Sequence, residues 1–303
     1  MTPTSNPDSE LETVVSEIQR MDPTGSRIAR VLRESFDQIY DGQRSGHYRW
    51  DQLHKTEKTH FGTLVEINLN HEFRFGEGHT MDYSIAGVEV DCKYSQTIGG
   101  WMIPREAIDH LCLLVWADDE QGVWSLGIIR ITANILNSGK NLDSKRTISA
   151  ANRVGIRWIF DKSALPPNVL LQLNRATVDR IMALPSGQQR VNEIFRVAQG
   201  RRIGGAVIAT LAQQKDYMKR VRGNGGARST LKAEGFIILG HYQKHRRIAR
   251  ELEVEVPKKG EFVAVRVVRA SAGEPGAAKI NDSYWRLAKN GDNVTTAPDV
   301  PHS

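Results

Sequence analysis

Apolar residues recur at helical spacing early in the chain, with polar residues between them. The spacing predicts one helix over residues 9–21 and a second that starts at a Thr24 or Ser26 cap. A third helix is expected after Thr59, because threonine is a favoured N-cap residue. The apolar faces of these helices consist of Leu11, Val14, Val15, Ile18 and Met21, then Ile28, Val31, Leu32, Phe36, Ile39 and Tyr40, then Phe61, Leu64, Val65, Leu69 and Phe73.

A pattern of period two covers residues 88–94, where apolar and charged residues alternate. Such alternation is typical of a strand with one buried face. The opposite face then carries Glu89, Asp91 and Lys93 together. Ala86-Gly87, just upstream, predicts a hairpin turn that folds the preceding residues back beside this strand.

Longer apolar runs at 111–117 and 122–130 predict adjacent strands in the middle of a sheet. Residues 158–160 add an edge element. The stretch 161–168, with its paired prolines, is the expected domain boundary. The sequence thus predicts an α/β (α+β) fold, with one unit over 1–162.

The second unit, over 169–303, is expected to begin with helices. Their apolar residues are Val191, Ile194, Phe195 and Ala198, then Ile203, Val207, Ile208 and Leu211. Residues 229–238 are similar to the end of a winged-helix recognition helix that runs into its wing strand, and 262–268 alternate as a partner strand would. The polar tail, 288–303, is expected to fray.

The formal net charge of +6 is divided unequally. Residues 1–160 contain 17 basic and 22 acidic residues, whereas residues 161–303 contain 24 and 13, so the halves carry −5 and +11. A strongly basic half favours a polyanionic partner, and nucleic acid is the leading candidate. No apolar run reaches membrane-spanning length and the N-terminus is polar, so a cytoplasmic protein is expected. Cys92 and Cys112 lie in apolar runs and are expected to be buried free thiols.

The acidic half contains a candidate metal site. The hairpin places Asp82 beside Asp91, and two carboxylates with a main-chain carbonyl, assigned to Cys92, suit Mg²⁺. Lys93 is then placed to hold or deprotonate an attacking water. Glu66, at the edge of its helix's apolar face, is either an exposed helix charge or a third acid directed at the metal.

Basic residues in the other candidate region outnumber acids by six to one between 215 and 232, around a glycine-rich break. Glycines permit close backbone approach, so the stretch favours phosphate and base contacts. The polar stretch 51–60 is either a phosphate-facing loop or a solvated linker. The candidate DNA-binding residues are Lys55, Lys58, Lys219, Arg220, Arg222, Arg228 and Lys232.

Residues 39–44 are similar to the Lys-x-Asp-Gly-x-Arg motif of DNA ligases. In those enzymes the leading lysine forms a covalent bond to the nucleotide. Here Ile39 takes that position before Tyr40, Asp41 and Gly42, and isoleucine has no nucleophile to offer. Ligation is therefore excluded.

The chain resembles the NaeI-type restriction endonucleases from about residue 10 to near 300. The residues that carry the resemblance are 40–44, 51–60, 62–69, 90–93, 190–193, 206–210 and 219–223. It implies a restriction-endonuclease fold in the front domain, a mixed sheet flanked by helices. There, Glu66, Asp82, Asp91 and Lys93 fall on the family's acid, acid and Asp-x-Lys positions.

The resemblance further implies a back domain with a helix-turn-helix like that of the catabolite activator protein and of topoisomerases. It implies a homodimer that uses Mg²⁺, cleaves the palindrome GCCGGC in double-stranded DNA, and is activated by a second DNA copy bound at the back domain. The ligase-like stretch without its lysine is also a trait of the family.

Two other classes of function stay open at this point. One is a DNA-binding regulator whose front domain is an inactive nuclease-like scaffold, and the four polar residues of the candidate site argue against it. The other is a relative of topoisomerases or ligases, against which Ile39 argues.

Overall fold

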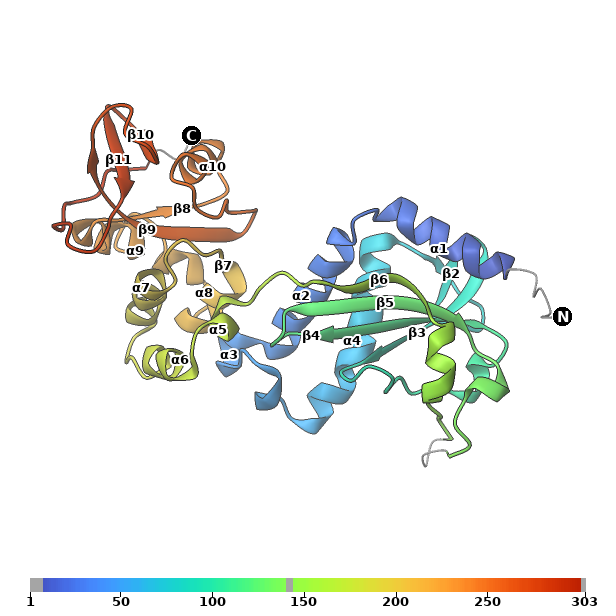
Figure 1. Cartoon of the computed structure of the whole chain (residues 1–303). Coiled ribbons are helices and arrows are strands. Elements are labelled where there is room, and N and C mark those ends of the chain that lie inside the picture. The colour runs from blue at the N-terminus through green and yellow to red at the C-terminus, as the bar shows by residue number, and fades with distance from the viewer. Residues whose placement is uncertain (1–7, 140–143, 301–303) are drawn as a thin grey trace. The chain divides into compact units, whose positions relative to one another are not determined.

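The computed structural model describes residues 8–139 and 144–300, and the chain divides into two compact units (Figure 1). The first consists of Met1–Ile39 and Leu53–Pro167, and the second of Tyr40–Gln52 and Asn168–Ser303. The division at 167 lies close to the expected boundary, but the expected units, 1–162 and 169–303, differ from this partition. The segment 40–52 belongs to the second unit, which is therefore discontinuous in sequence.

The first unit contains a six-stranded sheet with helices packed on it (Figure 1). Its helices are α1 (Ser9–Met21), α2 (Ser26–Tyr40) and α4 (Lys55–Phe73), with short 3-10 turns at Arg105–Ala107, Ala133–Ile135 and Ala150–Gly155. Its strands are β1 (Gly76–Glu77), β2 (Tyr83–Ile85), β3 (Val88–Ser95), β4 (Leu111–Asp118), β5 (Val123–Arg130) and β6 (Arg157–Ala164).

The strands lie in sequence order, and all neighbours are antiparallel except β3 and β4, which are parallel. The expected neighbours β4 and β5 pair along their whole length, from Leu111 with Arg130 to Asp118 with Val123. The edge element at 158–160 is confirmed as part of β6, which continues to Ala164 and so occupies part of the expected linker. The front of the chain is a mixed α/β unit, as the sequence predicted.

Both faces of β3 are covered, which the one-sided alternation did not indicate. On one face, Phe61 of α4 packs edge-on against Tyr94 with ring centroids 4.7 Å apart. On the other lies an apolar cluster that includes Trp101, whose indole N–H donates to the Val115 carbonyl at 2.8 Å. Asp91 is consequently only 5% exposed.

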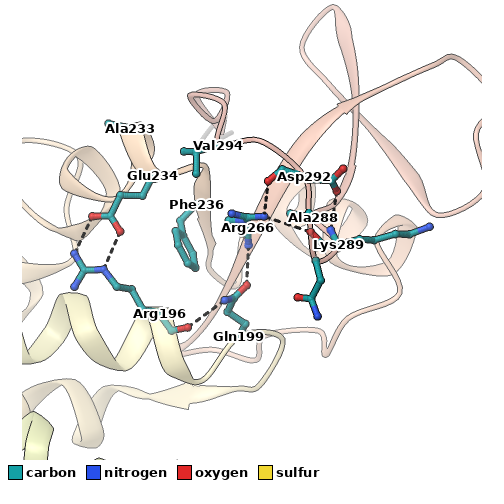
Figure 2. Close-up of a pocket in the computed structure, with 12 residues that line it drawn as sticks. Arg196, Gln199, Ala233, Glu234, Phe236, Arg266, Ala288, Lys289, Asp292 and Val294 are labelled. Carbon is teal, nitrogen blue, oxygen red and sulfur yellow. Dashed lines mark hydrogen bonds and ion pairs between the residues drawn. The ribbon is translucent and has the colours of Figure 1, made fainter.

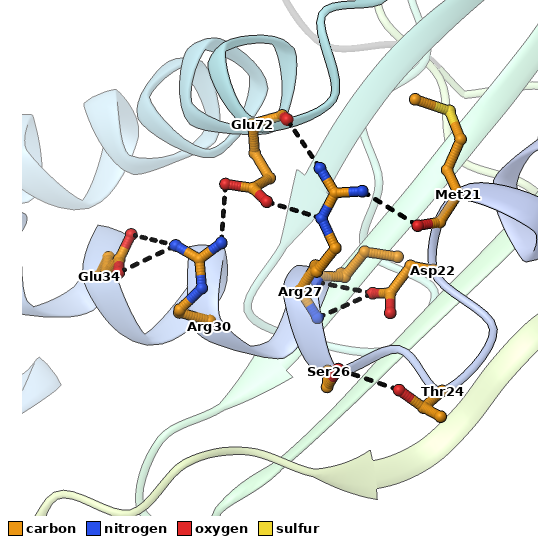
Figure 3. Close-up of polar contacts among 9 residues, drawn as sticks. Met21, Asp22, Thr24, Ser26, Arg27, Arg30, Glu34 and Glu72 are labelled. Carbon is orange, nitrogen blue, oxygen red and sulfur yellow. Dashed lines mark hydrogen bonds and ion pairs between the residues drawn. The ribbon is translucent and has the colours of Figure 1, made fainter. Parts of the chain in front are cut away.

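A network of ion pairs fixes the end of α4 that follows the candidate acid Glu66 (Figure 3). Glu72 accepts from Arg27 Nε at 2.7 Å and contacts Arg30 at 2.7 Å. The guanidinium of Arg27 also donates to the carbonyls of Met21 and Glu72. The corner between α1 and α2 is thereby tied to α4, which holds the helix in place across the sheet.

The start of α4 differs from the prediction. The helix begins at Lys55, not after Thr59, and His54 is its N-cap. Glu57 accepts from the His54 N–H at 2.7 Å, which completes a capping box. Six of the ten residues expected in a loop at 51–60 are therefore helical, because Glu57 closes the first turn at His54, earlier than a cap at Thr59 would.

The second unit contains short helices and a five-stranded sheet. Its helices are α3 (Gly42–Ser45), α5 (Val169–Gln172), α6 (Arg175–Met182), α7 (Gly187–Val197), α8 (Gly205–Ala212), α9 (Ala227–Thr230) and α10 (Gln243–Glu251), with 3-10 turns at Trp50–Gln52, Tyr217–Arg220 and Lys232–Glu234. Its strands are β7 (Ile203–Gly204), β8 (Phe236–Leu239), β9 (Glu261–Ala270), β10 (Ala277–Ile280) and β11 (Ser283–Leu287).

The long strand β9 organises this second sheet, since β7, β8 and β11 all pair with it in antiparallel fashion. The expected partner strand at 262–268 lies within β9, and Phe236 of β8 pairs with Arg266. Ile203, expected in a helix, belongs instead to β7, and α8 begins two residues later.

The ligase-like segment is built into the second unit. Asp41 adopts a left-handed conformation (φ 43°) at the start of α3, which packs on α8. A Cβ at Gly42 would lie 2.1 Å from Thr210 Oγ1 and 2.6 Å from the His47 carbonyl oxygen. Only glycine permits this approach, so the Asp-Gly pair has a structural role here.

The tail is ordered up to Val300, contrary to the expectation that it frays. Ala297 is buried and its N–H donates to the Lys232 carbonyl at 2.9 Å. Asp299 accepts from Lys232 Nζ at 2.6 Å. The first residues of the chain, 1–7, and the last, 301–303, lie outside the described residues, so the predictions that concern them stay untested.

A cavity of about 700 Å³ lies around Phe236, between the end of α7 and the segment 288–294 (Figure 2). Both arginines of the lining have partners within the protein: Arg196 forms two hydrogen bonds of 2.8 Å to Glu234, and Arg266 donates to the main-chain carbonyls of 289 and 292. The lining carries three cationic side chains, Arg196, Arg266 and Lys289, against the two acids Glu234 and Asp292, so the cavity is polar with a small excess of positive charge. Across the described residues, no helix has the length and apolar character needed to cross a membrane.

Candidate active site

The hairpin between β2 and β3 positions the first acid. Ala86 (φ 51°) and Gly87 (φ 81°) are both left-handed, as the commonest two-residue hairpin turn requires, and Ile85 pairs with Val88. Two residues away from the turn, Tyr83 pairs with Val90, which is the last pair of these two strands. Asp82 lies immediately before Tyr83 in the chain, just beyond the paired region. Its carboxylate takes the place of a strand partner, since Oδ2 accepts the Cys92 N–H at 2.8 Å.

The structure brings Asp82, Asp91 and Lys93 together, as the sequence predicted. Lys93 Nζ lies 2.6 Å from Asp91 Oδ1 and 3.3 Å from Asp82 Oδ2. It also donates to the main-chain carbonyl of Cys92 at 2.9 Å. One ammonium group thus contacts all three oxygens that were assigned to a cation.

Burial sets the electrostatics of this cluster. It raises the pKa of Asp91 to about 6, although the neighbouring Lys93 ammonium opposes the rise. For Lys93, burial alone would lower the pKa, but Asp91 outweighs it and the pKa is raised. Cys112, the strand partner of Asp91, places Sγ 3.8 Å from Asp91 Oδ2, and burial keeps the pKa of this thiol well above its usual range. At neutral pH the pair is therefore ionised beside a neutral thiol.

Glu66 lies on α4 close to the cluster. Its main-chain carbonyl accepts the Tyr83 hydroxyl at 2.7 Å, which links α4 to β2. Burial raises the pKa of the Glu66 carboxyl, and the negative charge of Asp82 raises it further. The half-buried carboxyl is thus within electrostatic reach of Asp82, and its role as a third acid stays a prediction.

A preformed metal cage is absent from the part of the chain that the structure describes: no three His, Cys, Asp or Glu side chains converge at metal-binding distances. The Lys93 ammonium instead contacts both aspartates. The Lys93 contacts show that these residues can surround a cation, because the ammonium is already held by two carboxylate oxygens and one carbonyl oxygen. A hard cation that prefers oxygen ligands fits these residues.

Glu89 has a separate role that the sequence did not reveal. Its carboxylate accepts the N–H groups of His79, Thr80 and Met81 at 2.7, 2.8 and 3.0 Å. These hydrogen bonds lower the pKa of Glu89 to about 2. Glu89 therefore holds the turn before Asp82 and does not join the cluster.

The candidate DNA-binding residues are dispersed, and some have structural partners. Lys55 is exposed and Lys58 half-exposed in the first turn of α4. Lys219 is exposed, Arg220 donates to Gln214 at 2.9 Å, and Arg222 pairs with Asp216 at 3.4 Å. In contrast, Arg228 is largely buried and donates to the Ile238 carbonyl, while Lys232 pairs with Asp299. The last two stabilise the second unit internally.

Sequence reasoning missed another basic group, on α10. Lys244, Arg246, Arg247 and Arg250 are all exposed on this helix. The signal was present in the sequence as four basic residues within seven positions, 244–250.

Comparison with known proteins gives two concordant matches. Residues 12–296 match the family described as restriction endonuclease NaeI. The chain is also 48% identical over 305 residues to the type II restriction enzyme NaeI of Lentzea aerocolonigenes, covering 98% of this chain and 96% of that protein. Both matches span the two units.

Proposed function

The chain belongs to the NaeI family of type II restriction endonucleases, and on this premise we propose that it hydrolyses phosphodiester bonds of double-stranded DNA at the palindrome GCCGGC. The observation that carries the proposal is the convergence of Asp82, Asp91 and Lys93 at the end of the β2–β3 pairing. An inactive scaffold has no need of one buried and one half-buried carboxylate held around an ammonium, because removing charge from water is costly.

We assign Asp82, Asp91 and the Cys92 carbonyl as the residues that hold Mg²⁺, with Glu66 as a further acid. When bound, Mg²⁺ supplies Lewis-acid polarisation of the phosphate and lowers the pKa of a bound water. The support for this assignment is the oxygen set that contacts the Lys93 ammonium.

The chain's own residues then orient the reaction. The Cys92 N–H fixes Asp82, and the parallel pairing of β3 with β4 fixes Asp91. Lys93, released from the aspartates, positions the attacking water and offsets the charge that develops on the phosphate. The water oxygen forms the new bond to phosphorus while the bond from phosphorus to one sugar oxygen breaks. The attacking water gives up one proton to solvent and the departing sugar oxygen takes up one proton from solvent, which leaves a phosphate monoester and a hydroxyl group.

The second unit supports a proposed winged helix-turn-helix. Its elements follow the order α7, β7, α8, α9, β8 and β9, and both β7 and β8 pair with β9. Helices α8 and α9 correspond to the two helices of the motif, and α9 would face the DNA groove. The described α9 has only four residues, so the 3-10 turn Lys232–Glu234 extends it.

A homodimer and a second, activating DNA copy complete the proposal. A palindrome has twofold symmetry, and a symmetric dimer places one active site on each strand. The +11 charge of residues 161–303 favours a DNA site in the second unit that is separate from the aspartate cluster.

The active site is tested by Asp91→Ala and Lys93→Ala, with Glu77→Ala as the matched control on an exposed position of the same sheet. We expect both site variants to lose cleavage of a mapped plasmid in Mg²⁺ while they keep DNA binding, and the control to cleave normally. Wild-type rates in Asp91→Ala would refute the assignment, as would loss of DNA binding without loss of folding.

The activating copy is tested by adding a short cognate duplex to a poorly cleaved plasmid. We expect the duplex to accelerate wild-type cleavage, and we expect the Arg220→Ala/Arg222→Ala variant to respond less while it still cleaves a good site. A flat wild-type response would show that the second unit only anchors the substrate.

A further inference from the structure

Helix α10 presents an exposed basic surface that lies outside the helix-turn-helix elements. It is inserted between β8 and β9, the two strands that would form the wing. One side of the helix is buried through Ile248 and Ala249, which pack in the cluster that contains β10 and β8 residues. The remaining side carries Lys244, Arg246, Arg247 and Arg250. Because Ile248 and Ala249 are packed in the core, the basic side of the helix is held facing outwards.

The charges on this surface are largely uncompensated. Among the described residues, Lys244, Arg246 and Arg250 form no ion pair, whereas Arg247 pairs with Glu251 at 3.2 Å and donates to the Lys279 carbonyl. Glu251 is the only acid on α10. Like charges one turn apart repel each other, and binding an anion relieves that repulsion.

The start of α10 lies near the segment proposed to enter DNA. A Cβ on Gly240 would lie 3.4 Å from a terminal guanidinium nitrogen of Arg228, in α9, and 3.9 Å from the Tyr242 ring at the start of α10. The beginning of α10 and α9 therefore meet over one glycine. Lys219 and Arg222, which precede α9, are exposed as well.

From these contacts we propose that α10 binds the phosphate backbone of duplex DNA through Lys244, Arg246 and Arg250, extending the footprint of the second unit beyond α9. The proposal rests on the proposed function, which supplies duplex DNA as the partner. Lysine and arginine side chains on a rigid helix are typical phosphate contacts, and they position a duplex without reading its sequence. Because the exposed side of α10 is polar throughout, it offers no apolar surface for insertion into a lipid layer.

The test compares full-length wild type with Lys244→Gln/Arg246→Gln/Arg250→Gln. The matched control, Lys258→Gln/Lys259→Gln/Lys289→Gln, removes the same charge from exposed positions of the same unit. Fluorescence anisotropy of a labelled cognate duplex is measured in Ca²⁺ over a range of salt concentrations. Each lost phosphate contact lowers the slope of log affinity against log salt by about 0.9, so the α10 variant should lose up to about 2.7.

We expect the α10 variant to show the shallower slope with cognate and unrelated duplexes alike, and the control to match wild type. An unchanged slope in the α10 variant, with wild-type binding and cleavage intact, would overturn the proposal and leave the proposed function standing. Absence of binding and cleavage in the wild type would instead overturn the proposed function. If the wild type bound anionic vesicles as tightly as the duplex, and the α10 variant lost that vesicle binding, the assignment of this surface to DNA would be overturned. Arg247→Gln should have a smaller effect than Arg246→Gln, because Arg247 is already paired.

Discussion

The buried ion pair between Arg33 of α2 and Asp119 of the β4–β5 turn should make a large contribution to the stability of the first unit. The Arg33 guanidinium forms two hydrogen bonds to the Asp119 carboxylate, and the side chains are 10% and 2% exposed. Arg33 also contacts Asp37 at 3.0 Å. Arg33→Met therefore removes the guanidinium partner of the buried Asp119 carboxylate, and it removes a favourable ion pair from Asp37 as well.

Breaking a buried pair from one side costs about 3–5 kcal/mol, because the remaining charge stays desolvated and loses the compensation of this partner. At about 2–4 °C per kcal/mol for a unit of this size, the midpoint of thermal unfolding should fall by roughly 6–20 °C. The double variant Arg33→Met/Asp119→Leu removes both charges and should recover most of the loss, since a hydrophobic pair of similar volume is often neutral.

Hydrogen exchange of peptides from β4 and β5 reports on the first unit alone, and it avoids the assumption that the whole chain unfolds in one step. The reasoning predicts faster exchange in Arg33→Met and near wild-type exchange in the double variant. If the double variant is destabilised by the sum of the two single substitutions, the pair is not coupled and the electrostatic argument is wrong.

Three further predictions follow from other parts of the molecule. Gly42→Ala should destabilise the second unit by about 1–3 kcal/mol, because the new methyl group overlaps Thr210; Gly223→Ala, where a Cβ has open space, is the control, and equal urea midpoints for the two variants would contradict the close approach. Glu89 has a pKa of about 2 in the folded protein against an ordinary value of 4.5, so its stabilising effect is present above about pH 4.5 and is lost as the pH falls towards 2. The difference in urea midpoint between wild type and Glu89→Gln should accordingly narrow over that range, and a gap independent of pH would exclude the role given to this carboxylate. Incubation with labelled ATP or NAD should give no covalent adduct on denaturing electrophoresis, since Ile39 has no nucleophile; a labelled band would revive the ligase-like activity.

Local sequence was sufficient to predict the parts of the site that depend on local structure. The alternation at 88–94 and the Ala86-Gly87 turn predicted the hairpin, and the hairpin alone brings Asp82 to Lys93. What could not be predicted depends on distant residues. The burial of Asp91, for example, comes from the cluster around Trp101. The start of α4 is a different case: its capping partner Glu57 is only three residues from His54, but histidine is not among the favoured N-cap residues.

Charge patterns gave a less reliable guide than alternation. Arg228 and Lys232 lie in a basic stretch, yet one is held by a carbonyl of β8 and the other by Asp299 from the tail. The partners lie 10 and 67 residues away in the sequence, so the stretch itself could not reveal which of its basic side chains form hydrogen bonds or ion pairs within the protein. The exposed charges of α10 required the structure, because only packing shows that Ile248 and Ala249 turn the basic side outwards.

The discontinuity of the second unit has a consequence for how the protein is made. Residues 40–52 leave the ribosome before the strands of the first unit, but their packing partner α8 lies more than 150 residues later, at Gly205–Ala212. Domains generally fold in order of synthesis, so the first unit can close while α3 and Tyr48, part of the core of the second unit, still lack their binding surface. The second unit can complete its core only after translation has passed α8. A ribosome-bound chain stalled shortly before that helix would therefore carry a finished first unit and a segment at 40–52 whose Tyr48 side chain still lacks the core that buries it.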